Sequence, residues 1–174
     1  MAYTWWFTGL PGAGKTTLAN TWAIHLKNQD RLAVVLDGDD LRRGLSIGLG
    51  FSKADRAENM RRVALVARLL NREGIDAMVA LVSPSTHGRA SARDIVGKER
   101  FIEIYVSTPL NICQQRDPKG LYRRAANNEQ LQLTGVQAPY EPPEYPELMI
   151  DTSQMALSEA ILHLDSVLKS RSAN

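Results

Sequence analysis

Nine residues near the start of the chain have the composition of a phosphate-binding loop. They are Gly9, Leu10, Pro11, Gly12, Ala13, Gly14, Lys15, Thr16 and Thr17, and the first eight match G-x-x-x-x-G-K-[ST] in full. Glycines let the backbone curl so that successive N–H groups face one anion, and a following helix adds the positive end of its dipole. In such a loop the lysine reaches the β- and γ-phosphates and the threonine hydroxyl binds Mg²⁺. The motif therefore predicts an ATP site over these nine residues, with Lys15 catalytic and Thr16 at the metal.

A second group of chemically capable residues follows the apolar run at 33–36. Carboxylates at the carboxyl end of a parallel strand lie at the sheet edge where α/β proteins bind ligands. Asp37 or Asp39 could hold Mg²⁺ through water, or could accept the proton of an attacking hydroxyl. A solvated turn rich in Asp and Gly is the alternative, but the nearby phosphate loop favours a functional role for Asp39. Arg42 could bind an anionic substrate. We assign Asp37 to the metal and to substrate binding, and Asp39 to catalysis and substrate binding.

Strand-like and helix-like segments alternate along the chain, which is typical of an α/β fold with a largely parallel sheet. The expected strands cover residues 4–8, 33–36, 77–82, 101–106 and 148–150, and the expected helices cover 15–27, 53–73, 89–96, 110–115 and 156–169. Ser52 is a plausible N-cap for the second helix, and Gly74 a plausible stop. The pattern predicts a three-layer sandwich of the P-loop kinase class, with a single domain over residues 1–174.

One stretch, at residues 116–147, differs from the rest because it is rich in proline, glycine and charge. A loop this long inside a compact domain is usually a functional lid or a disordered segment. The regular pattern resumes after it, which favours a lid.

Composition narrows the class of protein. The net charge of +2 is too small to indicate a nucleic-acid polymer as partner. No segment approaches the roughly 20 apolar residues that a membrane-spanning helix needs, and the uncharged start does not look like a secretory signal. The single cysteine, Cys113, cannot form an intrachain disulfide and is expected to be a buried apolar residue. A reducing compartment suits such a chain, so we expect a cytoplasmic protein. No Asn-Lys-x-Asp motif of a GTPase is present, which favours a kinase of small molecules.

Further motifs follow the phosphate loop in order. They are Leu36-Asp37-Gly38-Asp39 with Arg42, Leu49-Gly50-Phe51-Ser52, Asp55-Arg56, Glu58-Asn59, Arg61-Arg62, Ser83-Pro84, Arg116-Asp117-Pro118-Lys119-Gly120-Leu121-Tyr122, and Pro139-Tyr140-Glu141 with Pro143. Together they resemble the adenylylsulfate kinase family, whose members phosphorylate adenosine 5′-phosphosulfate on its ribose 3′-hydroxyl. The resemblance covers residues 8–152. It implies ATP and Mg²⁺ as cofactors, a nucleotide as the second substrate and, as is usual for such relatives, a homodimer.

The resemblance also implies roles for the matching residues. Arg42, Arg56 and Asn59 would hold the acceptor nucleotide through its phosphosulfate and ribose. Phe51 would stack on the acceptor's adenine, a contact that is worth about 1–3 kcal/mol per base in comparable sites. Arg116 would lie near the ATP base.

Three more positions are assigned in the same way. Lys119 would meet the transferring phosphate or the substrate, and is counted as catalytic. Val82 and Ser83 would contact the acceptor. Ser83 matches a serine often described as a phosphoserine intermediate in this family, and it is also counted among the catalytic residues. A hydrogen-bonding role is expected rather than a covalent one, because no base lies next to it in sequence.

Five positions depart from the family pattern, all on the acceptor side. Ser85 and Thr86 stand where the family usually has an aromatic residue and Arg, and Leu131 and Leu133 replace a Lys-x-Phe run. Leu133 thus occupies the place of a Phe that closes the other side of the substrate adenine. Gln137 replaces an Asp.

These departures leave alternatives to adenylylsulfate open. One is another activated nucleotide as acceptor, as in the cytidine diphosphoramidate kinases. Another is a regulatory nucleotide-binding module of weakened activity, against which the intact Lys15, Thr16 and Asp39 argue.

Overall fold

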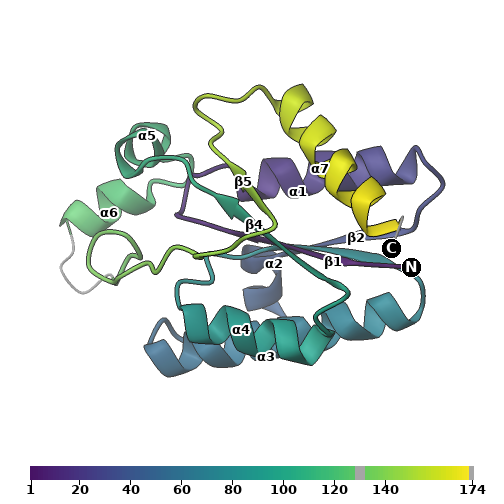
Figure 1. Ribbon diagram of the computed structural model, residues 1–174. Helices are drawn as coiled ribbons and strands as arrows, with labels where there is room; N and C mark the ends of the chain where they lie inside the picture. The colour runs from purple at the N-terminus through teal and green to yellow at the C-terminus, as the bar shows by residue number, and fades with distance from the viewer. Residues whose placement is uncertain (128–131, 173–174) are drawn as a thin grey trace.

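Five parallel strands form the central sheet of the computed structural model, which describes residues 1–127 and 132–172 (Figure 1). The strands are β1 (Thr4–Thr8), β2 (Ala33–Asp37), β3 (Asp76–Ala80), β4 (Phe101–Val106) and β5 (Leu148–Ile150), in the spatial order β2-β3-β1-β4-β5. The helices are α1 (Lys15–Lys27), α2 (Gly38–Arg43), α3 (Lys53–Arg72), α4 (Thr86–Val96), α5 (Leu110–Arg116), α6 (Leu121–Asn127) and α7 (Leu157–Ser172). All pairings between the strands are parallel, as predicted.

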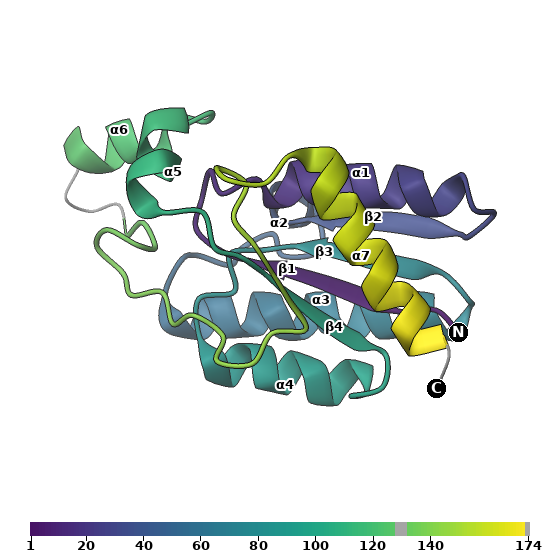
Figure 2. The same ribbon diagram turned by 45° about the horizontal axis from the view of Figure 1, so that its top comes forward.

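Helices cover both faces of the sheet, α1 and α7 on one side and α3 and α4 on the other (Figures 1 and 2). The adjacent Trp5 and Trp6 of β1 are both fully buried but belong to different apolar clusters, because successive strand residues point to opposite faces. Trp5 meets Trp22 of α1 edge to face at 4.9 Å, and Trp6 stacks on Phe101 at 5.4 Å. The predicted three-layer α/β sandwich is therefore confirmed.

Two short helices were missing from the sequence prediction, and both are capped by an aspartate. The Asp37 carboxylate accepts a hydrogen bond from the N–H of Asp39 at 3.0 Å and opens α2, where the sequence suggested only an acidic turn. The Asp117 carboxylate accepts from the N–H groups of Tyr122 (3.1 Å) and Arg123 (3.0 Å) and opens α6. The proposed lid segment, 116–147, therefore contains a helix as well as loops.

Several element boundaries also differ from the expectation, by one to three residues each. α4 begins at Thr86 instead of residue 89, because the Ser85 hydroxyl caps it by accepting from the N–H of Gly88 at 3.2 Å. β3 ends at Ala80, two residues early. The long helix was predicted well: Ser52 is the N-cap of α3, and Gly74 follows its end with a left-handed φ of 76°.

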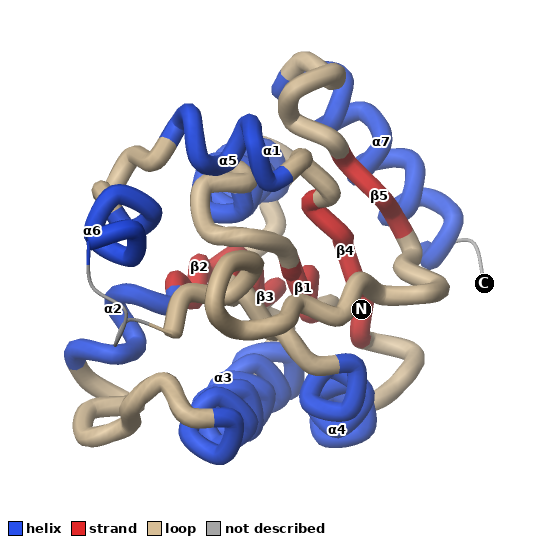
Figure 3. Tube along the Cα trace, turned by 90° about the vertical axis from the view of Figure 1, so that its left-hand side faces the viewer, coloured by secondary structure: helices blue, strands red, loops and turns tan. Residues whose placement is uncertain are grey.

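The carboxyl ends of the strands meet at one edge of the sheet, which faces the viewer in Figure 3. The phosphate loop follows β1 there, the acidic residues follow β2, and Val82 and Ser83 follow β3. α5 and α6 lie beyond the same edge (Figure 2). Within the described residues, no helix combines the length and the apolar character needed to cross a membrane.

The cap of α3 gives a test of how this helix is held. Ser52→Ala removes the hydroxyl that accepts from the N–H of Asp55 at 3.1 Å. The loss should cost about 1 kcal/mol of folding free energy, or roughly 2–4 °C in Tm by calorimetry. Ser52→Thr keeps a hydroxyl at the cap, which can also donate to the Asp55 carboxylate as the Ser52 hydroxyl does at 2.6 Å, and is the matched control. Equal Tm values for the two variants would contradict the assignment.

Candidate active site

The phosphate loop curls tightly against neighbouring backbone, and this leaves no room for a side chain at Gly9 or Gly12. A Cβ on Gly9 would clash with the carbonyl oxygen of Val106, and one on Gly12 would lie 3.0 Å from that of Cys113. Gly12 also has a left-handed φ of 77°, which L side chains rarely adopt. The loop runs directly into α1, so its N–H groups and the helix end can face the same anion.

Lys15 lies inside this curl. Its Nζ donates hydrogen bonds to the carbonyl oxygens of Gly9 at 2.9 Å and Leu10 at 2.7 Å. Burial lowers the pKa of the Lys15 ammonium to about 8, since the charged form loses solvation there. The loop thus holds a cation whose charge would be favoured by the phosphates of a nucleotide.

The two residues predicted to bind a metal lie in contact. The Thr16 hydroxyl donates to Asp37 Oδ2 at 2.6 Å, while Asp37 Oδ1 caps α2. Hydroxyl and carboxylate oxygens suit Mg²⁺, which commonly takes one or two protein ligands together with substrate phosphates. No group of three His, Cys, Asp or Glu residues gathers as a metal site in the parts of the chain that the structure describes. The residues present therefore fit a magnesium ion shared with a nucleotide, rather than an all-protein metal centre.

The structure brings together two of the predicted catalytic residues, from segments 80 positions apart. Lys119, between α5 and α6, forms an ion pair with the carboxylate of Asp39, in α2. Both side chains are half-exposed, so the pair lies at the surface of the site. The predicted lid thereby contacts the acidic residues after β2.

Arg116 reaches the phosphate loop by a route that the sequence did not suggest. Its guanidinium donates to the side-chain oxygen of Thr152 at 2.7 Å and to its carbonyl oxygen at 3.0 Å. Thr152 in turn donates to the carbonyl oxygen of Ala13 at 2.8 Å, and Thr108 donates to the same atom at 3.0 Å. Sequence reasoning missed both threonines, because a threonine just after a strand is too common to be a signal.

Arg42, Phe51 and Arg56 form a basic and aromatic cluster. The guanidinium carbons of Arg42 and Arg56 lie 4.3 and 5.4 Å from the centroid of the Phe51 ring. Phe51 is 59% exposed and so is not a core residue. Burial lowers the pKa of both arginines, and the charge of Arg42 lowers that of Arg56 further. Two cations held this close beside an open aromatic ring suit a ligand that combines an anion with a base.

Asn59 lies one turn after Arg56 on α3 and is only 5% exposed. Among the described residues, no donor reaches its Oδ1 atom. A buried polar atom without a partner typically costs about 1–3 kcal/mol, so such an atom calls for an explanation. A hydrogen-bond donor on a bound ligand would give this Oδ1 atom its partner.

Ser83 lies in the buried part of the site, and its assignment as a catalytic residue stays a prediction. It is 3% exposed, and its hydroxyl oxygen accepts a hydrogen bond from Trp6 Nε1 at 2.9 Å. The expected hydrogen-bonding role fits this arrangement. The carbonyl oxygen of Val82 accepts hydrogen bonds from the Thr8 hydroxyl at 2.8 Å and from the N–H of Gly9 at 3.4 Å. Val82 thereby links the loop after β3 to the start of the phosphate loop.

Leu133, which the resemblance assigns to one side of the acceptor's adenine, is buried in the structure, and that role stays a prediction. It is 7% exposed and packs in the apolar cluster that contains Trp5. Gln137 braces the same turn, accepting from the N–H of Leu133 and donating to the carbonyl oxygen of Ala125, both at 3.2 Å. Leu131 lies outside the described residues.

The other departures from the family pattern also serve the fold. Ser85 caps α4, and the N–H of Thr86 donates to the carboxylate of Glu141 at 2.8 Å. Ser85, Leu133 and Gln137 are thus each occupied within the protein, so their difference from the family pattern is no direct sign of a different acceptor.

The pKa of Lys15 predicts a proton uptake when a nucleoside triphosphate binds. Above pH 8 a growing share of Lys15 is neutral, and bound phosphates should favour the charged form. Uptake should therefore approach about one proton per site near pH 9, and the affinity should fall as the pH rises through this range. Calorimetric titration in two buffers of different ionisation enthalpy measures it.

Lys15→Arg is the control, because it keeps a cation that does not titrate in this range. The variant should bind without proton uptake. Buffer-independent heats for the unaltered protein near pH 9 would contradict the prediction.

Comparison with known proteins shows which family this chain resembles. The family model "Adenylylsulphate kinase" matches residues 1–151. The chain is 47% identical over 156 residues to a probable adenylyl-sulfate kinase of Halalkalibacterium halodurans, covering 90% of this chain and 77% of that protein. It is 48% identical to the adenylyl-sulfate kinase of Paraburkholderia xenovorans over 156 residues, which are 90% and 87% of the two chains.

A solved structure agrees with these relatives. The APS kinase of Mycobacterium tuberculosis, in complex with AMPPNP and APS, superimposes with a TM-score of 0.92 at 40% identity, covering 97% of this chain and 98% of that one. The matches extend over nearly the whole fold and include every element that carries the site. The chain belongs to the adenylylsulphate kinase family.

Proposed function

We propose that this protein is an adenylylsulfate kinase. It transfers the γ-phosphoryl group of ATP to the ribose 3′-hydroxyl of adenosine 5′-phosphosulfate and yields 3′-phosphoadenylylsulfate, a step of sulfate assimilation. The observation that carries the proposal is the presence, at one sheet edge, of the phosphate loop with Lys15 and of the cluster Arg42, Phe51 and Arg56. The named functions of the relatives and the ligands of the solved family member support it.

ATP lies on residues 9–17 in this proposal, with Arg116 near its base. Lys15 stabilises charge on the transferring phosphoryl group, because its ammonium is held within the loop that cradles the phosphates. Thr16 and Asp37 hold Mg²⁺, which when bound neutralises phosphate charge. Their oxygens already lie 2.6 Å apart in the structure.

The acceptor lies across the edge from ATP. Phe51 stacks on its adenine, while Arg42 and Arg56 pair with the phosphosulfate. The free Oδ1 of Asn59 accepts a hydrogen bond from a ribose hydroxyl, which satisfies an atom otherwise buried without a partner among the described residues.

Asp39 orients or deprotonates the ribose hydroxyl in this scheme. Lys119 approaches the same carboxylate from the lid, so an ammonium is at hand where negative charge develops during transfer. Arg56 Nη2 also donates to the carbonyl oxygen of Gln132 at 2.8 Å, a second link between the acceptor side and segment 116–147. We propose that this segment closes over the substrates and excludes water, which limits futile hydrolysis of ATP.

We extend the proposal to three properties that rest on resemblance and composition. The protein acts in the cytoplasm, it forms a homodimer, and residues 1–174 make up one kinase domain. Size-exclusion chromatography with light scattering tests the second.

A coupled assay of ADP release tests the central proposal. Adenylylsulfate is compared with a panel of activated nucleotides that includes cytidine compounds, with Lys15→Ala as the inactive control. Adenylylsulfate should be preferred at least tenfold in kcat/KM, or about 1.4 kcal/mol. A cytidine compound as the better substrate would overturn the proposal. Turnover no higher than that of Lys15→Ala on every nucleotide would instead favour a regulatory module.

The role of Phe51 gives a sharper test of the acceptor site. Phe51→Ala should raise the KM for adenylylsulfate about 5- to 150-fold, because a base–aromatic stack of about 1–3 kcal/mol is lost. Leu69→Ala removes a similarly exposed apolar side chain near the far end of α3 and is the control, with an unchanged KM. The two variants should have similar Tm values, since neither side chain is buried. An unchanged acceptor KM in Phe51→Ala would place the base elsewhere.

A further inference from the structure

The backbone after β3 is held in an unusual conformation. Ser83 has a φ of 46°, in the left-handed region. For a residue with a Cβ this costs about 1–2 kcal/mol, and such residues persist only where their surroundings over-determine them. In the strand order β2-β3-β1, this loop lies between the acidic residues after β2 and the phosphate loop after β1. It therefore occupies the place where the two substrates of a transfer reaction would meet.

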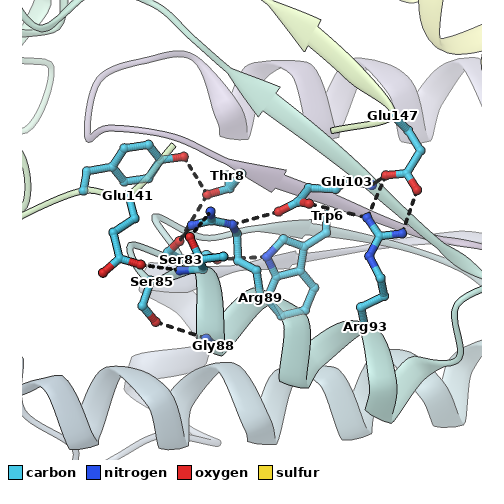
Figure 4. A network of polar contacts seen from close by, with 12 residues as sticks. Trp6, Thr8, Ser83, Ser85, Gly88, Arg89, Arg93, Glu103, Glu141 and Glu147 are labelled. Carbon is cyan, nitrogen blue, oxygen red and sulfur yellow. Dashed lines mark hydrogen bonds and ion pairs between the residues drawn. The ribbon is translucent and has the colours of Figure 1, made fainter. Parts of the chain in front are cut away.

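Three donors fix Ser83 from two different elements (Figure 4). Its carbonyl oxygen accepts from Arg89 Nη1 at 2.8 Å and from the Thr8 hydroxyl at 3.3 Å. Its hydroxyl accepts from Trp6 Nε1 at 2.9 Å. Trp6 and Thr8 belong to β1, whereas Arg89 belongs to α4. Hydrogen bonds from both elements therefore hold the loop at Ser83.

Arg89 is the charged member of this set, and it is 3% exposed. Its Nε donates to Glu103 of β4 at 2.8 Å, and its Nη2 lies 3.3 Å from the hydroxyl oxygen of Thr86. One guanidinium thus ties the loop to α4 and to β4. A lysine in its place could not make these contacts together, because its single ammonium lacks the planar fork.

The C-terminal part of segment 116–147 contacts the same loop. The N–H of Glu141 donates to the carbonyl oxygen of Pro84 at 2.8 Å, and its carboxylate accepts from the N–H of Thr86. The Tyr140 hydroxyl lies 2.9 Å from that of Thr8, and its ring centroid lies 5.9 Å from the guanidinium carbon of Arg89. Figure 4 shows Thr8 and Glu141 beside the buried Arg89.

We propose that Arg89 is a positioning residue for the acceptor nucleotide. Its guanidinium holds the carbonyl of Ser83 in the left-handed conformation, and so fixes the backbone of Val82 and Ser83 against which the acceptor binds. Arg89 touches neither substrate. The inference rests on the proposed function in assigning this loop to the acceptor side.

The test compares Arg89→Met with Arg93→Met. Arg93 lies one turn further along α4, also pairs with Glu103 (3.4 Å), and binds Glu147 at 2.6 and 2.8 Å, but among the described contacts none joins it to Ser83. Both variants lose a partly or fully buried ion pair. They differ in the contact to the loop, so Arg93→Met shows what lost stability does by itself.

Arg89→Met should raise the KM for the acceptor about tenfold or more while the KM for ATP stays within about twofold, since a misplacement near 1 Å can cost about a hundredfold. Arg93→Met should lower Tm and leave both KM values within about twofold of the unaltered enzyme. Arg89→Lys should give an intermediate acceptor KM, and it carries the test if Arg89→Met does not fold.

An acceptor KM unchanged in the folded Arg89 variants, or KM values for ATP and acceptor that rise together, would overturn the proposal. A rise in acceptor KM in Arg93→Met equal to that in Arg89→Met would do the same. The unaltered enzyme first identifies the acceptor. If that is not adenylylsulfate, the proposed function fails, while the role of Arg89 is still decided on the acceptor that the enzyme uses.

Discussion

The parallel pairing of β1 with β3 on one side and β4 on the other brings the phosphate loop, the carboxylates after β2 and the loop at Ser83 to one place. Because all five strands run the same way, their carboxyl ends meet at one edge, and each strand delivers a different group there. The phosphate loop follows the central strand, the carboxylates follow β2, and Ser83 follows β3 between them. A single antiparallel strand in β2 or β3 would send its group to the opposite edge.

This edge carries charge that the protein itself only partly compensates. Lys15 is buried with two backbone carbonyls as its partners, and Arg42 and Arg56 share one aromatic ring with no carboxylate bonded to either in the described structure. Asp39 is paired with a lysine from the lid. An excess of partly desolvated cations is unfavourable in the free protein and favourable once phosphate groups lie among them. Only an anionic ligand offsets this unfavourable free energy, so the arrangement favours nucleotides over uncharged ligands.

Beneath the edge lies a second set of charges, which is buried at Arg89 and partly buried at Arg93 and Glu147. Arg89 and Arg93 of α4 bind Glu103 of β4, and Glu147 accepts from Arg93 and from the N–H of Glu103 (2.7 Å). Buried ion pairs of this kind add little net stability, because desolvation offsets the attraction, but their geometry is specific. Here that geometry reaches the loop at Ser83 and the C-terminal end of segment 116–147, so a network that adds little net stability can still fix the backbone of that loop.

The sequence by itself determined the phosphate loop, the strands and the long helices, and so the fold. These follow from local patterns: the spacing of glycines around Lys15, runs of apolar residues, and the cap at Ser52. The tertiary structure alone decided which side chains face the site. Leu133 and Ser83 proved to be buried, α2 and α6 formed on aspartate caps within stretches that resembled loops, and Arg89 turned out to bind the carbonyl oxygen of Ser83. Each of these depends on partners far away in the chain, as Arg89 does on Ser83 and Glu103. Local patterns encode backbone conformation, whereas the partner of a buried polar side chain is fixed only when distant segments pack together.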